Sequence, residues 1–329
     1  MNAQDSQALA DRIRSGDRRA LARGITLVES TREDHRTAAD GLLELLLRHA
    51  GESIRIGITG VPGVGKSTFI EAFGLHVIGQ GHRVAVLAVD PSSKRSGGSI
   101  LGDKTRMEEL AKNDAAFIRP SPAGETLGGV ARRTREAMLL CEAAGFDVIF
   151  VETVGVGQSE TAVADLTDLF LLLLLPGGGD ELQGLKRGIV EMADLVMVNK
   201  DDGDLADAAQ RAASEYRAAL HLLGAGTPDW PVPVATCSAL TGKGIEDAWQ
   251  WVETFRTTME PVGAIADRRA TQARAWMWSE IREGLMETLK ANPGVAACLP
   301  ALEADVGAGR ITPAAAARKL LDAFLDRSG

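Results

Sequence analysis

The sequence of 329 residues is short of aromatic residues, cysteines and long apolar runs. Aromatic side chains make up 4% of the chain, and all five tryptophans lie in its C-terminal third, which indicates packing or interface surface there. The cysteines Cys141, Cys237 and Cys298 lie far apart and form no C-x-x-C pair. This excludes a disulfide framework and a cysteine-based structural zinc site, and it predicts a cytoplasmic, reducing location.

No segment of the sequence has the length or composition of a membrane span. The longest apolar run, Leu169–Leu175, has seven residues, whereas a span needs about twenty. The first fifty residues carry many charges and no apolar core, so we expect no signal peptide. The net charge of −9 argues against a nucleic-acid-binding surface. We therefore expect neither a membrane nor a nucleic acid as a partner.

Residues 53–68, SIRIGITGVPGVGKST, combine a strand pattern, a glycine-rich loop and the start of a helix. Alternating isoleucines before the loop are typical of a buried strand, and the loop matches G-x-x-x-x-G-K-[ST] in full. Glycines in such a loop let backbone N–H groups turn toward phosphate oxygens, and the helix N-terminus adds partial positive charge. The predicted nucleotide-binding residues are Gly60, Val61, Pro62, Gly63, Val64, Gly65, Lys66, Ser67 and Thr68.

Lys66 and Ser67 supply the polar groups that bind triphosphate and metal in such a loop. A lysine at this position reaches the β- and γ-phosphates, and the hydroxyl that follows it ligates Mg²⁺. The alternative is a glycine-rich turn whose lysine and serine are incidental, but the flanking strand and helix patterns disfavour it. The sequence therefore predicts a site for a nucleoside triphosphate and Mg²⁺.

The chain around this loop alternates strand and helix patterns from residue 53 to about residue 257. Most strand candidates are continuous apolar runs, as expected when helices cover both faces of a sheet. We predict an α/β fold of the P-loop NTPase type, with a doubly wound, mostly parallel sheet. Helical patterns on either side predict an N-terminal extension (1–50), a nucleotide-binding domain (51–260) and a C-terminal extension (261–329). The candidate strands are Ile54–Thr59, Arg83–Asp90, Val148–Glu152, Leu169–Leu175, Leu195–Asn199 and Val232–Cys237.

A short polar segment after one of the later strands predicts that the nucleotide base is guanine. Asn199, Lys200 and Asp202 fit the pattern N-K-x-D. A carboxylate at Asp202 would accept hydrogen bonds from guanine N1–H and the 2-amino group, and adenine offers neither donor. An unpaired buried carboxylate is costly, so this contact discriminates strongly. A second base-side segment, Ser238-Ala239-Leu240, follows the last strand.

Carboxylates at the ends of two strands are candidate metal-positioning groups. Asp90 and Glu152 each end a strand, and Asp103 lies in a glycine-rich connection. The usual GTPase pattern after such a strand is D-x-x-G. Glu152 stands in place of the aspartate, and its side chain is longer by one methylene group. Helix or turn capping is the alternative role for these side chains. With Ser67, they form the predicted Mg²⁺ site.

Several longer segments together resemble one family of GTPases. They are AVDPSS (88–93), GGSILGDKTRM (97–107), FIRPS (117–121), VETVGVGQSE (151–160) and GDELQG (179–184). The chain resembles the MeaB/MMAA (ArgK-like) family, G-protein chaperones of adenosylcobalamin-dependent acyl-CoA mutases such as methylmalonyl-CoA mutase. The resemblance implies a SIMIBI-type G domain, for which glutamate at position 152 is usual. It also implies a third switch over 177–186 and a homodimer held by the C-terminal helices.

The resemblance further implies roles for particular residues and partners. Lys66, Asp90, Glu152 and Lys186 become the candidate catalytic residues. GTP or GDP would bind with Mg²⁺, and hydrolysis would gate transfer of adenosylcobalamin from an adenosyltransferase to the mutase. The chain itself is not expected to bind cobalamin. Methylmalonyl-CoA, ethylmalonyl-CoA and isobutyryl-CoA mutases all remain possible partners, and the group that activates the attacking water stays open.

Two other functions are compatible with the loop. The first is a kinase, as in the older ArgK or LAO/AO transport kinase label, but it predicts a phosphoacceptor pocket and usually ATP. The second is a metal-inserting GTPase, but such proteins usually carry histidine-rich or cysteine clusters. The five histidines and three cysteines of this chain are scattered.

Overall fold

The computed structural model describes residues 3–89, 107–120, 127–153, 159–177, 187–223, 227 and 229–325. The contacts divide the chain into two units, Met1–Arg269 and Ala270–Gly329. The domain boundaries expected after residues 50 and 260 mark where the helical extensions meet the nucleotide-binding domain. Their positions stay a prediction. Asp90, Asp103 and Lys186 lie outside the described residues.

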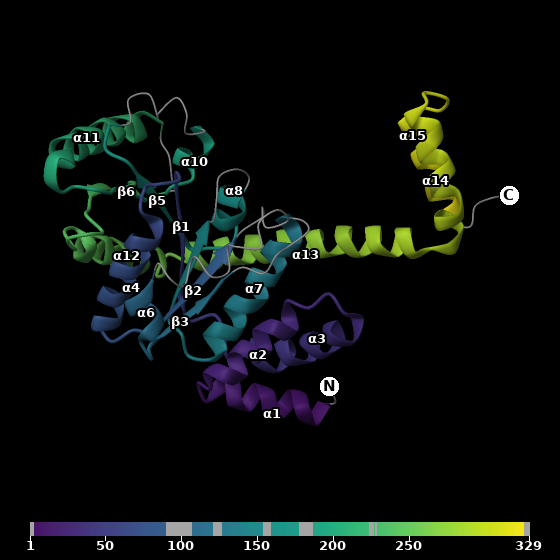
Figure 1. The fold of residues 1–329 in the computed structure, drawn as a ribbon, viewed down its shortest axis with the longest axis horizontal. Coiled ribbons are helices and arrows are strands. Elements are labelled where there is room, and N and C mark those ends of the chain that lie inside the picture. The colour runs from purple at the N-terminus through teal and green to yellow at the C-terminus, as the bar shows by residue number, and fades with distance from the viewer. Residues whose placement is uncertain are drawn as a thin grey trace. The chain divides into compact units, whose positions relative to one another are not determined.

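The first unit is built on a seven-stranded, all-parallel sheet with the strand order β3-β2-β4-β1-β5-β6-β7 (Figure 1). This confirms the predicted doubly wound α/β fold. The six expected strands all form, and the sequence analysis missed only β3, whose four residues are too few for a clear pattern. The strands are β1 (Ile54–Gly60), β2 (Val84–Val89), β3 (Ala116–Arg119), β4 (Val148–Thr153), β5 (Leu169–Leu174), β6 (Leu195–Val198) and β7 (Val234–Thr236).

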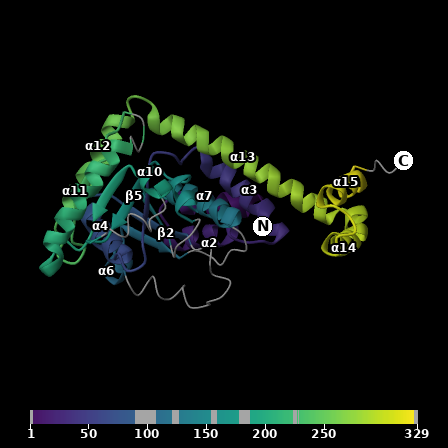
Figure 2. The same ribbon diagram turned by 90° about the horizontal axis from the view of Figure 1, so that it is seen from above.

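Helices cover both faces of this sheet, which explains its continuous apolar strands. Alternate residues of β5 face opposite ways: Leu171 and Leu173 join a core with α4 and α12, whereas Leu172 and Leu174 join a core with α11. Figures 1 and 2 show β2 between α4 and α7. The covering helices are α4 (Lys66–Gly79), α6 (Glu108–Lys112), α7 (Leu127–Ala143), α8 (Ser159–Ala164), α10 (Arg187–Glu191), α11 (Ala206–Leu223) and α12 (Ile245–Met259), with the short η1 (Gly203–Leu205) before α11.

The N-terminal segment forms the helical extension expected from the sequence. Its helices α1 (Ala3–Arg14), α2 (Arg18–Val28) and α3 (Glu33–Leu47) pack together, and α2 and α3 also pack on α7 (Figures 1 and 2). The Asp17 carboxylate caps α2 by accepting from the backbone N–H groups of Arg19 and Ala20. The bond from the Ala20 N–H, followed by a side-chain hydrogen bond from Arg12, favours the ionised form and holds the pKa of Asp17 below its ordinary value.

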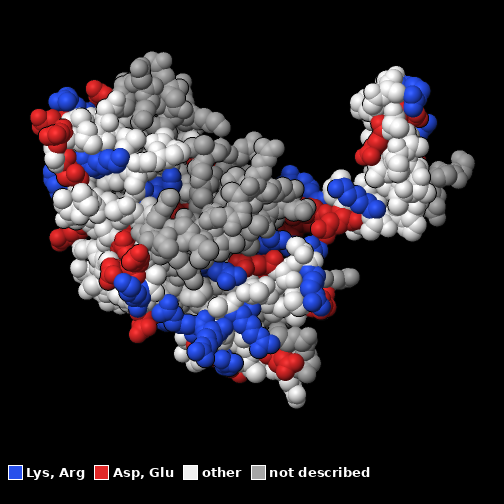
Figure 3. Space-filling view, in the orientation of Figure 1, with Lys and Arg blue, Asp and Glu red and all other residues white. Residues whose placement is uncertain are grey.

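Helices α1 and α2 carry several arginines, and Figure 3 shows Lys and Arg side chains gathered on the surface around α2. Three of them pair with nearby acids: Arg12 with Asp17, Arg14 with Asp11, and Arg18 with Asp114. Each pair is largely exposed, so water screens it. These three pairs are therefore ordinary contacts of a solvated face.

The second unit contains most of α13 (Ala264–Ala291), together with α14 (Pro293–Gly307) and α15 (Pro313–Phe324). Helix α13 ends just before Asn292-Pro293-Gly294, and the Asn292 side chain caps α14 by accepting from the N–H groups of Gly294 and Val295. The tryptophans differ in burial. Trp230 and Trp249 are buried in the core of the first unit, whereas Trp278 on α13 is 60% exposed. None of the helices in the described ranges is long and apolar enough to cross a membrane.

Buried ion pairs close the amino edge of the sheet, the edge opposite the glycine-rich loop. Asp168 and Asp194 stand just before β5 and β6, and their side chains are almost fully buried. Arg269 binds the Asp168 carboxylate with two nitrogens at 2.6 and 2.7 Å, and Arg268 binds Asp194 at 2.9 Å. The N-terminal part of α13 is thereby tied to the sheet, and the buried charges of Asp168 and Asp194 are both compensated.

Glu142 is the third buried acid at this edge. It accepts from Ser53 Oγ at 2.5 Å, from the Gly51 N–H at 2.8 Å and from Arg55 Nε at 2.8 Å. Burial by itself raises the pKa of Glu142, but the hydrogen bond and charge of Arg55 outweigh it and hold this pKa below its ordinary value. The folded protein is therefore stabilised by the ionised form.

We expect Glu142→Gln to lower the free energy of unfolding at pH 7 by about 3 kcal/mol, because it leaves the Arg55 charge uncompensated. A depressed carboxyl pKa contributes stability above its unfolded value, about 4.3, and loses it as the pH falls through the folded pKa. The difference between wild type and variant should therefore shrink at pH 4. Urea unfolding at pH 7 and pH 4 measures it, and an equal difference at both values would contradict the assignment.

Candidate nucleotide-binding site

The glycine-rich loop lies between the end of β1 at Gly60 and the start of α4 at Lys66. Gly65 precedes the helix with a φ of +93°, a left-handed conformation that side chains rarely adopt. A Cβ on Gly65 would lie 2.9 Å from Asn199 Nδ2, so only glycine fits there. The first N–H groups of a helix have no partner within it, so those at the start of α4 are available to phosphate oxygens.

The Lys66 ammonium is held over this loop. Its Nζ donates to the carbonyl oxygen of Gly60 at 2.6 Å and lies 3.5 Å from that of Val61. Burial lowers the pKa of Lys66, and the negative charges of Glu152 and Glu160 oppose that effect. No role was expected for Glu160 from the sequence. The one feature that could have indicated a role is its position at the end of the family motif VETVGVGQSE (151–160). The structure places two carboxylates close enough to stabilise the charged lysine.

Asn199 joins the glycine-rich loop to the second base-side segment. Its Nδ2 donates to the carbonyl oxygen of Val64 at 2.8 Å, and its Oδ1 accepts from the backbone N–H of Ala239 at 3.0 Å. The side chain is 2% exposed, so both bonds are protected from water. Segments that are more than a hundred residues apart in sequence therefore meet at one buried amide.

Asp202 and Ser238 meet on the base side of the site. The Asp202 carboxylate accepts a hydrogen bond from the Ser238 hydroxyl, the only partner this carboxylate has within the described ranges. Lys200, two residues earlier, has a φ of +64°, a left-handed turn that separates Asn199 from the aspartates. Leu240 is 80% exposed, whereas Ala239 is buried. The six predicted base-side residues thus lie on two adjoining loops.

The metal side of the site is described only in part. Glu152 is 3% exposed at the end of β4, where it lies between Ile58 of β1 and Ala88 of β2 in the sheet. Beside it, the hydroxyls of Thr59 and Thr153 are 2.9 Å apart and join β1 to β4. In the part of the chain that the structure describes, no three His, Cys, Asp or Glu side chains cluster closely enough to bind a metal alone. Ser67 and Glu152 offer oxygen ligands, which fit Mg²⁺ because that ion takes few protein ligands and keeps phosphate and water oxygens.

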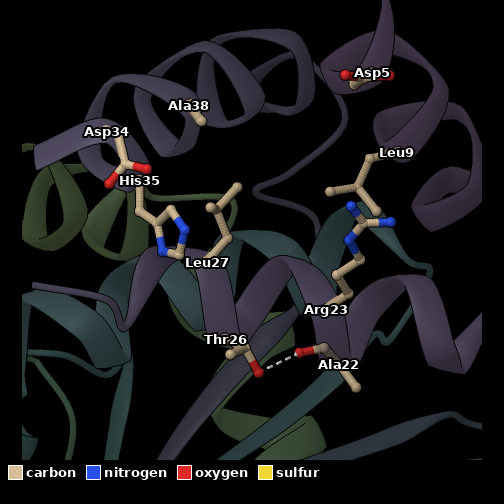
Figure 4. A pocket seen from close by; sticks show the side chains of 9 residues that line it. All are labelled: Asp5, Leu9, Ala22, Arg23, Thr26, Leu27, Asp34, His35 and Ala38. Atoms are coloured by element: carbon tan, nitrogen blue, oxygen red, sulfur yellow. Dashed lines mark hydrogen bonds between the residues drawn. The ribbon is translucent and has the colours of Figure 1, made fainter. Parts of the chain in front are cut away.

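A separate cavity of about 590 Å³ lies among the N-terminal helices, away from the glycine-rich loop. Figure 4 shows side chains from α1, α2 and α3 around it, among them Leu9, Arg23, Leu27 and His35. The His35 ring lies 2.8 Å from the Ser30 hydroxyl. No predicted site residue lines this cavity, so it does not belong to the nucleotide site.

The phosphate loop, its lysine and the base-side loops therefore come together at the carboxyl ends of parallel strands, where ligands bind in open α/β sheets. A glycine-rich loop before a helix, combined with an N-K-x-D segment on this fold, defines the chain as a P-loop GTPase.

The chain belongs to the family described as "Methylmalonyl Co-A mutase-associated GTPase MeaB", whose family model matches residues 21–294. A Caulobacter vibrioides protein named as a GTPase is 59% identical over 322 residues, covering 98% of each chain. The mouse protein "Methylmalonic aciduria type A homolog, mitochondrial" is 49% identical over 98% of this chain and 81% of its own length. The crystal structure of a LAO/AO transport system kinase superposes with a TM-score of 0.77, at 38% identity and 98% coverage of both chains. These findings confirm the family expected from the sequence motifs.

Proposed function

We propose that this GTPase is a chaperone of an adenosylcobalamin-dependent acyl-CoA mutase, methylmalonyl-CoA mutase or a close relative. The observation that carries the proposal is the match to a mutase-associated GTPase family over residues 21–294, which spans the whole nucleotide site. GTP binding and hydrolysis gate loading of the cofactor and protect or reactivate the mutase. The adenosyltransferase acts indirectly, and cobalamin is held by the partner rather than by this chain.

In this proposal the phosphate side of the site binds and orients the triphosphate. The N–H groups of the loop and of the start of α4 bind phosphate oxygens, and Lys66 neutralises charge on the β- and γ-phosphates. Ser67 and Glu152 hold Mg²⁺, with Asp90 and Asp103 proposed beside them. When bound, Mg²⁺ neutralises negative charge that develops on the phosphates. Lys186 is proposed as a further catalytic residue.

The base side of the site selects guanine. Asp202 accepts from N1–H and the 2-amino group, while Lys200 lays its alkyl stem along the base. The buried Asn199 amide holds the P-loop at a fixed distance from Ala239. Ser238 orients the Asp202 carboxylate, and Leu240 covers the base.

A homodimer in the cytoplasm is part of the same proposal. Along α13, the apolar side chains of Met277, Trp278, Ile281 and Leu285 are between 39% and 60% exposed. A row of this kind on one helix is typical of a protein–protein contact. We propose that it meets the second subunit, and light scattering of the purified chain measures its mass directly.

The central experiment measures GTP hydrolysis by the purified chain alone and with each adenosylcobalamin-dependent acyl-CoA mutase of the same organism. We expect slow hydrolysis alone and at least about a tenfold increase with the cognate mutase, since partner-supplied groups accelerate GTPases by larger factors still. Absence of stimulation by every such mutase would overturn the proposed function. Transfer of the γ-phosphate to an amino acid or a binding protein would favour a kinase instead.

A further inference from the structure

Asp201, which the N-K-x-D pattern leaves unspecified, has a buried side chain that binds three neighbours. Its Oδ2 accepts from Thr236 Oγ1 at 2.6 Å and from Gln210 Nε2 at 2.9 Å, and it lies 2.9 Å from Lys243 Nζ. The side chain is 0% exposed, whereas that of Lys243 is 57% exposed. Asp201 is thus fixed in place by β7, by α11 and by the loop before α12.

Three side-chain links join the first base-side loop (199–202) to the second base-side loop (238–243). Asn199 binds the backbone of Ala239, Asp202 binds Ser238, and Asp201 binds Lys243. The first two links use residues proposed to contact or frame the nucleotide. The Asp201–Lys243 link uses none of them, so its contribution is to position the loops.

Backbone hydrogen bonds within the second loop connect Lys243 directly to Ser238. The backbone N–H of Ser238 donates to the carbonyl oxygen of Lys243 at 2.9 Å, and that of Gly242 donates to Ser238 at 2.9 Å. On the first loop, the Asp201 N–H donates to the carbonyl oxygen of Cys237 at 2.9 Å. Since consecutive Cα atoms are about 3.8 Å apart, displacement of Asp201 displaces Asp202 as well.

The charge of Asp201 strengthens the link. Burial by itself raises the pKa of Asp201, but hydrogen bonds from Thr236 and Lys243 outweigh it and lower this pKa. An ionised carboxylate inside the protein binds its donors more strongly than a neutral amide would. The aspartate therefore constrains the distance between the two loops more strongly than an asparagine could.

We propose that Asp201 is a positioning residue for guanine selectivity, which acts through Lys243 to set the distance between Asp202 and Ser238. This inference rests on the proposed base-reading role of Asp202. It extends that role by assigning part of the selectivity to a pair that does not touch the nucleotide. A purely structural role for the pair predicts equal losses of affinity for every nucleotide, whereas a positioning role predicts a selective loss.

The test compares affinities for GTP and ITP, because inosine lacks the 2-amino group that Asp202 is proposed to bind. In Asp201→Asn and in Lys243→Met, we expect the ratio of the ITP to the GTP dissociation constant to fall about tenfold, as when one charge-assisted hydrogen bond is misaligned. The double variant should lose no more than either single variant. Lys112→Met, which removes an exposed ion pair with Glu109, is the matched control and should leave the ratio unchanged.

The outcomes separate this inference from the proposed site. A wild-type protein that prefers GTP and variants that keep the same ratio would overturn the positioning role and leave the base assignment intact. A wild-type protein without preference for GTP over ITP would overturn both. Lys243 is more than half exposed, so Lys243→Met provides a folded variant even where Asp201→Asn is unstable.

Discussion

Lys66→Ala is expected to reduce kcat/KM for GTP by about 100- to 1000-fold, the usual cost of removing one preorganised charge from a transition state. The ammonium is already fixed over the loop by the carbonyl oxygen of Gly60 at 2.6 Å. Single-turnover hydrolysis of GTP measures the effect.

The matched comparison is Lys66→Arg, which keeps the charge. An arginine is planar and longer, so it cannot reproduce a point charge pinned between two carbonyl oxygens, and we expect it to recover little activity. Circular dichroism and the unfolding midpoint establish that both variants fold. Hydrolysis within threefold of wild type in Lys66→Ala would show that the phosphate site lies elsewhere.

Asp202→Asn is expected to weaken GTP binding by at least about 100-fold and to reverse the preference toward XTP. The carboxylate presents only acceptors, which suit the N1–H and 2-amino donors of guanine. In the variant, the asparagine NH₂ group would face guanine's 2-amino group. Both groups are donors, so no hydrogen bond can form between them. Xanthine carries an oxygen at that position, and it would accept from the new amide.

Competition of GTP, XTP and ATP against a fluorescent guanine nucleotide measures this change. Asp204→Asn is the matched control, because Asp204 is exposed on η1 two residues further on and belongs to no predicted site. It should leave all three affinities unaltered. If Asp202→Asn kept the wild-type order of affinities, the base would be read by another residue.

Those parts of this protein that depend on neighbouring residues could be predicted from local patterns. Continuous apolar runs predicted six strands of the sheet, because strands buried on both faces need apolar residues at every position. The order of glycines, lysine and serine in 60–67 predicted the phosphate loop, because its backbone N–H groups and side chains come from one short segment. The Asn292 cap of α14 is local in the same way, because its side chain binds N–H groups two and three residues further on.

Only the tertiary structure decided which distant side chains meet. The charge of Glu160 opposes the fall in the pKa of Lys66, Asn199 spans from Val64 to Ala239, and Asp201 pairs with Lys243. The ion pairs of Arg268 and Arg269 likewise depend on where α13 begins relative to the sheet. Such contacts depend on the order of the strands in the sheet, which differs from their order in the chain. No local sequence pattern encodes that order. A buried charge must find its partner within a few ångströms, and only the packed fold sets that distance.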